Sequence, residues 1–120
     1  MAHRVLIVED EPNIADALKF LLTHEGFDVA VENDGGNAVA RIVSESADLV
    51  ILDVMLPNRS GFDILRDLQI RPWAPPVLML TAKGQPQDRE TARELGASRF
   101  ITKPFSNAEV VETVREMTAS

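Results

Sequence analysis

Apolar residues along the chain follow two alternating spacings, and each spacing predicts its own kind of element. One is the short uninterrupted apolar run, which indicates a β-strand buried on both faces when it is rich in β-branched residues. The other places apolar residues three and four positions apart, which is typical of one face of a helix. Runs of strand length stand at residues 4–8, 49–53, 77–81 and 99–102, and residues 27–31 alternate with a period of two.

Segments with helical spacing separate these runs. The first begins at Pro12, a residue suited to the first helical turn, and Gly26 suits its C-terminal end. Gly96 closes a polar fourth helix, while Ser106 and Glu109 match a capping box at the start of the fifth. The other expected features are helices over residues 38–43, 62–68, 88–95 and 106–117, a turn over 34–36, and irregular chain over the three prolines of 71–76.

Five strands that alternate with five helices predict an α/β fold. Such alternation implies parallel strands joined by right-handed crossovers, with helices on both faces of the sheet. A chain of 120 residues without a linker or an internal repeat is expected to form one domain over residues 1–120.

Composition narrows the classes of function. The net charge of −7 argues against a domain that itself binds nucleic acid, because such binding rests on Lys and Arg. No apolar run is long enough to span a membrane, and no signal-peptide pattern precedes the first strand. The chain has no cysteine, so no disulfide framework or thiolate metal site is expected. Together these features favour a cytoplasmic location.

Polar residues stand where the predicted strands end, which is the edge where open parallel sheets place their functional sites. Glu9 and Asp10 follow the first strand and Asp53 ends the third, while Thr81 and Lys103 stand at the ends of the fourth and fifth. Carboxylates that converge repel one another, and a divalent cation with oxygen ligands, such as Mg²⁺, would resolve the repulsion. A cation, an ammonium and a hydroxyl around a carboxylate can stabilise a transferring phosphoryl group. Asp53 is therefore a candidate nucleophile that would form an aspartyl phosphate.

Simpler explanations exist for each residue taken alone. An aspartate after a strand is usually a turn or helix cap, and Lys103 could be a solvated surface charge. Taken together, the residues favour a functional site, because the ends of four strands bring carboxylates, a hydroxyl and an ammonium to one edge of the sheet. Two other classes fit less well. A phosphohydrolase of the aspartyl type would need a second Asp at the position of Met55. A flavodoxin would need a Ser/Thr/Gly phosphate loop where EDEPN (9–13) stands, and these acids would repel phosphate.

Four motifs resemble the receiver domains of two-component response regulators. These are VLIVEDE (5–11), LVILDVMLPNRSG (49–61), VLMLTA (77–82) and FITKPF (100–105), which together extend over nearly the whole chain. The resemblance implies a flavodoxin-like, doubly wound (βα)5 fold whose five-stranded parallel sheet has the order 2-1-3-4-5.

The resemblance also implies a phosphorylation site with a metal ion. Asp53 is expected to be the phosphoacceptor. Asp10 is expected to bind Mg²⁺ directly and Glu9 through water, while Asp53 and the backbone carbonyl of Met55 complete the protein's share of the metal shell.

Three further residues are expected to respond to the phosphoryl group. Thr81 corresponds to the switch hydroxyl, Phe100 to the switch aromatic residue and Lys103 to the lysine that pairs with phosphoryl oxygens, with a cis peptide between Lys103 and Pro104. Phe100 departs from the common Tyr, so it cannot donate a hydroxyl hydrogen bond. Ser98 and Arg99 replace an acidic pair found in many DNA-binding receivers of the winged-helix class, which argues against that class's dimer.

The implied function is a phosphorylation-dependent signalling switch rather than a turnover enzyme. It would accept a phosphoryl group from a histidine kinase or a histidine phosphotransfer protein and assist its own phosphotransfer and dephosphorylation. The fourth helix, fifth strand and fifth helix would form the face that controls an output domain or partner, with a phosphorylation-dependent homodimer as one use of it. An inert docking receiver is the alternative, and a Mg²⁺-dependent phosphohydrolase is less favoured. Because few apolar residues line the fourth helix, residues 82–95 are expected to be the least stable segment and to move on activation.

Overall fold

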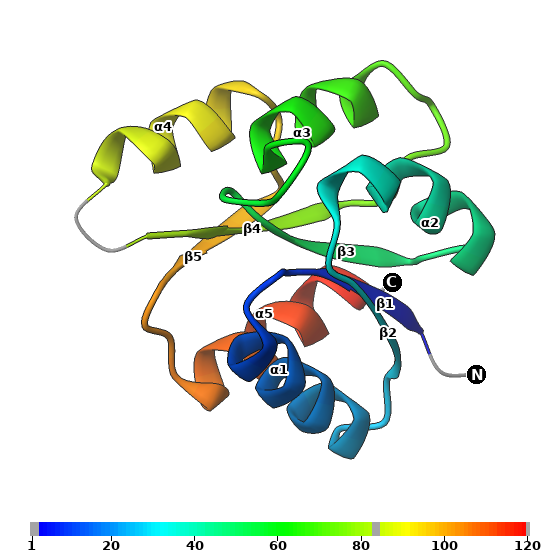
Figure 1. The fold of residues 1–120 in the computed structure, drawn as a ribbon. Coiled ribbons are helices and arrows are strands. Elements are labelled where there is room, and N and C mark those ends of the chain that lie inside the picture. The colour runs from blue at the N-terminus through cyan, green and yellow to red at the C-terminus, as the bar shows by residue number, and fades with distance from the viewer. Residues whose placement is uncertain (1–2, 83–84, 120) are drawn as a thin grey trace.

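The computed structural model describes residues 3–82 and 85–119, and its centre is one parallel β-sheet. The strands lie in the order β2-β1-β3-β4-β5, which confirms the predicted fold class and strand order (Figure 1). Their bounds are β1 (Arg4–Val8), β2 (Asp28–Glu32), β3 (Leu49–Asp53), β4 (Val77–Thr81) and β5 (Arg99–Thr102).

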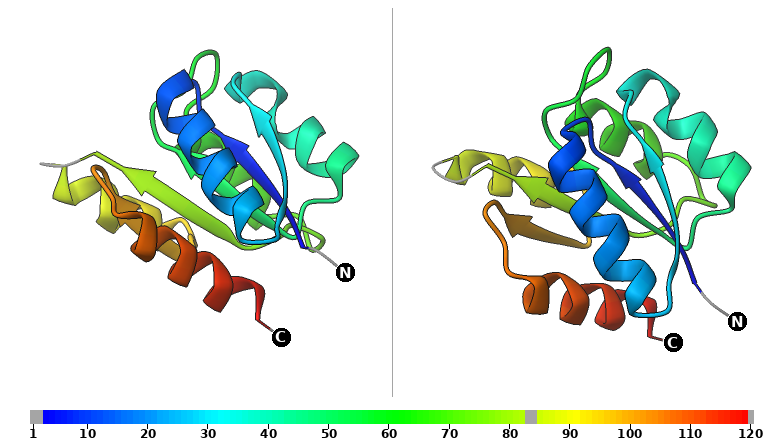
Figure 2. Two further views of the ribbon diagram at one scale, coloured as in Figure 1. Left: turned by 90° about the horizontal axis from the view of Figure 1, so that it is seen from below. Right: turned by 60° about the horizontal axis from the view of Figure 1, so that its bottom comes forward.

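Helices cover both faces of this sheet. Helices α1 and α5 lie on one face, and α2, α3 and α4 lie on the other (Figures 1 and 2). The bounds are α1 (Pro12–His24), η1 (Gly35–Asn37), α2 (Ala38–Glu45), α3 (Gly61–Gln69), α4 (Pro86–Glu94) and α5 (Asn107–Thr118). None of these helices is long and apolar enough to cross a membrane, within residues 3–82 and 85–119.

The two helical layers explain why the central strands are apolar without interruption. All five residues of β3 and of β4 are buried. Side chains of a strand point alternately to its two faces. In β3, Val50 and Leu52 pack toward α2 and α3, whereas Leu49 and Ile51 pack toward α1 and α5. Each face of the strand therefore needs apolar residues.

Several element bounds differ by one or two residues from the sequence-based expectation, and three differences have a local physical cause. Strand β2 begins at Asp28, because the N–H of Phe27 still donates to the carbonyl of Leu22 in the C-terminal turn of α1. The segment expected as a turn over 34–36 forms the 3₁₀ helix η1, whose N-terminus is capped by the side chain of Asp34. Helix α4 begins at Pro86 rather than at residue 88, since the fixed φ of proline suits a first helical position.

We expect α4 to be the helix whose amides exchange fastest with solvent. Helices α3 and α4 both have nine residues, but α3 buries Ile64, Leu65 and Leu68 whereas α4 buries Ala92 alone. Burial of a leucine-sized side chain stabilises by about 1.5–3 kcal/mol, so amides of 86–94 should exchange roughly tenfold or more faster than those of 61–69. Hydrogen exchange with mass spectrometry measures this, and equal protection of the two helices would contradict it. Residues 83 and 84 of the expected weak segment lie outside the described residues.

Candidate functional site

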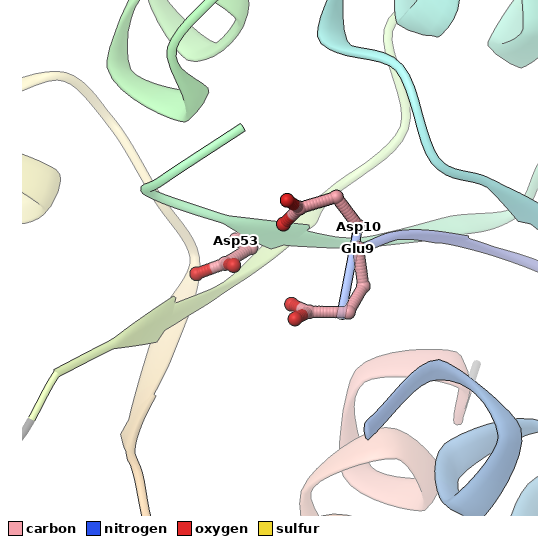
Figure 3. Close-up of side chains that lie close together, drawn as sticks. All are labelled: Glu9, Asp10 and Asp53. Atoms are coloured by element: carbon pink, nitrogen blue, oxygen red, sulfur yellow. The ribbon is translucent and has the colours of Figure 1, made fainter. Parts of the chain in front are cut away.

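Three carboxylates meet at the C-terminal edge of the sheet (Figure 3). Asp53 is the last residue of β3, and Glu9 and Asp10 directly follow β1, the strand beside it. One carboxylate oxygen from each residue lies within 4.8 Å of the others. Glu9 is 1% exposed and Asp53 5% exposed, whereas Asp10 faces solvent. The site thus combines two buried acids with one that is open to a ligand.

The alternation of side chains along the strands explains why Glu9 and Asp53 meet. Glu9 continues the alternate positions of Val5 and Ile7, and Asp53 continues those of Leu49 and Ile51, all on the side of α1 and α5. Lys103 reaches the same side from the loop between β5 and α5. The peptide bond from Lys103 to Pro104 is cis, as the resemblance implied.

Lys103 bridges the two buried acids. Its Nζ lies 3.2 Å from Oδ2 of Asp53 and 3.4 Å from both carboxylate oxygens of Glu9. The pKa of Glu9 is raised to about 8, chiefly because the carboxylate is removed from water and also because Asp53 lies beside it, while Lys103 opposes the increase.

The donor set fits a small divalent cation. Oxygen ligands from three carboxylates, one of them exposed, suit Mg²⁺ bound with several waters. A cation would also oppose the repulsion that raises the pKa of Glu9. Met55, the source of the expected backbone ligand, lies two residues beyond Asp53 and is 75% exposed.

Thr81 and Phe100 lie toward the opposite helical layer. Thr81 ends β4, is completely buried and makes a 3.2 Å hydrogen bond between its hydroxyl and that of Thr102 on β5. Phe100 packs at the edge of the core beneath α4, where the guanidinium carbons of Arg89 and Arg93 lie 4.6 Å and 5.9 Å from the centre of its ring. The expected switch residues therefore contact β5 and α4, while Glu9 and Asp53 lie on the side of α1 and α5.

The sequence matches the model of a known protein family. The model of the response regulator receiver domain matches residues 5–115. The chain belongs to this family. It is consequently a signalling domain of two-component systems rather than a conventional enzyme. Receiver domains typically bind Mg²⁺ in an acidic pocket, and this receiver domain has such an acidic cluster at Glu9, Asp10 and Asp53.

Solved structures similar to this receiver domain share its fold over nearly the whole chain. A protein of Chloroflexus aurantiacus J-10-fl, provisionally described as a response regulator, is 31% identical with a TM-score of 0.95, covering 100% of each chain. The BeF3-activated N-terminal receiver domain of Klebsiella pneumoniae RstA is 31% identical with a TM-score of 0.92, covering 98% of this chain and 100% of that one. The receiver domain of a signal transduction histidine kinase from Syntrophus aciditrophicus is 34% identical with a TM-score of 0.90, covering 98% and 90%.

Sequence reasoning missed two sets of residues around the site. It did not predict the contact of Arg89 and Arg93 with Phe100, which depends on how α4 packs on the sheet. It also did not predict the hydrogen bond between Asp34 and Asn58, which joins two loops. The signal available for Asn58 was its place directly after Pro57, since proline and asparagine are typical turn residues.

Proposed function

We propose that this receiver domain, residues 1–120, is a phosphorylation-dependent switch in which Asp53 accepts a phosphoryl group. The donor would be a histidine kinase or a histidine phosphotransfer protein in the cytoplasm. Glu9, Asp10, Asp53 and the Met55 carbonyl would hold Mg²⁺. One observation carries the proposal: an acidic cluster of three carboxylates within 4.8 Å, with the ammonium of Lys103 3.2 Å from Asp53.

The proposed reaction is a transfer between two nucleophiles. A carboxylate oxygen of Asp53 attacks phosphorus, the P–O bond forms as the P–N bond to the donor imidazole breaks, and the imidazole leaves with the electron pair. Lys103 keeps its proton and pairs with a phosphoryl oxygen. Bound Mg²⁺ would supply positive charge for the other phosphoryl oxygens. The same residues would assist the later attack of water on the acyl phosphate.

The conformational response would start at Thr81. Its hydroxyl would give up the hydrogen bond to Thr102 and form one to a phosphoryl oxygen. This exchange would remove a side-chain hydrogen bond between β4 and β5. Phe100 would then rearrange together with Arg89 and Arg93, so that α4 moves. The face of α4, β5 and α5 would in this way control an output domain or partner, or a homodimer. Arg99 on this face pairs with Glu116 of α5 at 3.0 Å.

Intact mass after incubation with a small phosphodonor tests the proposal. With acetyl phosphate and Mg²⁺, we expect the chain to gain one phosphoryl group. With a chelator in place of Mg²⁺, we expect no adduct. A folded chain that gains no adduct with Mg²⁺ would instead indicate a docking receiver without phosphotransfer. Continuous release of phosphate, with many phosphate ions released per protein molecule, would favour the phosphohydrolase.

We expect replacement of Lys103 by Met to affect metal binding and phosphotransfer in opposite directions. The ammonium repels a cation beside Asp53, so its removal should tighten Mg²⁺ binding roughly fivefold, a difference of about 1 kcal/mol. Phosphorylation should slow, because a phosphoryl oxygen loses its partner. Calorimetric titration and intact mass measure the two effects. Lys19→Met, on the exposed side of α1, is the control. Unchanged or weaker Mg²⁺ binding by Lys103→Met would refute the expectation.

A further inference from the structure

Two loops beside the acidic cluster are joined by direct hydrogen bonds. One loop follows β2, and the other connects β3 to α3. The side-chain amide of Asn58 donates to Oδ1 of Asp34 at 3.0 Å, and the backbone N–H of Gly35 donates to the carbonyl of Pro57 at 3.1 Å. These contacts between residues 34–35 and 57–58 are called the loop clasp below.

The geometry of the loop clasp leaves little room for adjustment. A side chain on Gly35 would overlap the carbonyl oxygen of Arg59, so the two backbones are in contact there. Asn58 has a φ of 68°, a left-handed conformation that Asn tolerates better than most residues. The Asn58 amide and the N–H of Gly36 lower the pKa of Asp34, which therefore stays an ionised acceptor.

Asp34 is hydrogen-bonded to the last residue of β2. The same residue is also hydrogen-bonded to a member of the acidic cluster. The N–H of Asp34 donates to Oε2 of Glu32 at 3.1 Å. Glu32 is buried and pairs with Arg41 at 3.2 Å. The carbonyl of Glu32 accepts the N–H of Glu9 at 3.0 Å. A single strand end thus supports both the loop clasp and a residue of the proposed metal site.

The loop clasp holds the tip of the loop that contains Met55. At the base of this loop, the N–H of Gly61 donates to the carbonyl of Val54 at 2.9 Å, and the N–H of Val54 donates to the carbonyl of Leu80 at 3.3 Å. Met55 lies between that base and Asn58, so contacts on both sides restrain its backbone. Hydrogen bonds that orient a ligand commonly change metal affinity without touching the ion.

We propose that Asp34 and Asn58 are positioning residues for the Mg²⁺ site, because the hydrogen bond between them holds the loop that presents the Met55 carbonyl. This inference rests on the proposed function. It assigns a role to a side-chain pair that lies outside the acidic cluster and whose partners are 24 residues apart in the sequence.

Calorimetric titration of the metal-free chain with Mg²⁺ tests this inference. Asn58→Gly removes the side-chain amide. Because glycine adopts a positive φ without strain, a change in Mg²⁺ affinity then reports the lost hydrogen bond. Asp34→Ala removes the acceptor, and the double variant removes both. Asp34→Asn keeps an oxygen acceptor and serves as the conservative control. Thermal unfolding without Mg²⁺ establishes that each variant is folded.

We expect Asn58→Gly to raise the Kd for Mg²⁺ roughly fivefold, the effect of one hydrogen bond. Asp34→Ala should raise it at least as much, because this variant also loses the bond from the N–H of Gly36. The double variant should bind no more weakly than Asp34→Ala, since the bond between Asp34 and Asn58 is already absent there. Asp34→Asn should stay within about twofold of the wild type. Wild-type affinity in Asn58→Gly, or losses that add in the double variant, would overturn the inference. A wild-type chain that takes up neither Mg²⁺ nor a phosphoryl group would instead refute the proposed function, and the positioning role with it.

Discussion

Replacing Asp53 by asparagine is expected to abolish the phosphoryl adduct completely. The carboxamide of asparagine is not a nucleophile toward phosphorus, whereas a carboxylate can form an acyl phosphate. The substitution is nearly isosteric, and Asp53 is 5% exposed, so the buried position stays filled. Removal of one carboxylate also takes away a contribution that raises the pKa of Glu9. We expect a folded protein that no phosphodonor modifies, with intact mass as the measurement.

Asp48→Asn is the matched control for this experiment. Asp48 immediately precedes the same strand, β3, but lies at its opposite end. Its carboxylate accepts the backbone N–H of Arg4, and an asparagine oxygen can accept the same bond. This variant should gain one phosphoryl group as the wild type does. An adduct on Asp53→Asn would place the phosphoacceptor elsewhere in the chain.

Replacing Gly61 by alanine is expected to destabilise the domain strongly and to impair phosphorylation. The new methyl group would overlap the carbonyl oxygen of Asp53 and would lie 2.8 Å from its carbonyl carbon and 2.9 Å from Cα of Val54. All three atoms belong to the backbone and cannot rotate away. Overpacking costs about 3 kcal/mol at a site this rigid, which outweighs the gain of about 1 kcal/mol from replacing glycine in a helix.

Thermal unfolding and intact mass together measure the effect of Gly61→Ala. We expect Tm to fall by about 10 °C and the phosphoryl adduct to form more slowly, because relief of the overlap displaces Asp53. Gly26→Ala is the control: its φ is 95° and no atom lies near the new methyl group. Backbone strain alone costs about 1–2 kcal/mol there, with no effect on phosphorylation. Normal adduct formation by Gly61→Ala, or equally slow adduct formation by Gly26→Ala, would contradict this explanation.

Much of the fold was predictable because its signals are local. The apolar runs over 49–53 and 77–81 coincide with β3 and β4, since strands buried on both faces need apolar residues at every position. Strand β2 was placed one residue early, because the sequence does not show that Phe27 is still bonded to the end of α1. The start of α4 was placed two residues late, although Pro86 carried the signal.

The candidate site was predictable in its members and less so in its arrangement. Strand ends identified Glu9, Asp10, Asp53 and Lys103, and the structure brings these four together. The roles of Thr81 and Phe100 stay predictions. Nothing in the linear pattern showed that their contacts are to Thr102 and to the arginines of α4, because these contacts depend on the packing of β5 and α4.

The sequence by itself determined the alternation of strands and helices, the acidic residues at strand ends and, through its motifs, the family. These properties are set by spacing along the chain. The tertiary structure alone decided that Glu9 and Asp53 share one face of the sheet, that Lys103 bridges them and that the loops at Asp34 and Asn58 join. Such pairs are formed by residues far apart in sequence, and only the order of the strands and the packing of both helical layers bring them within hydrogen-bonding distance.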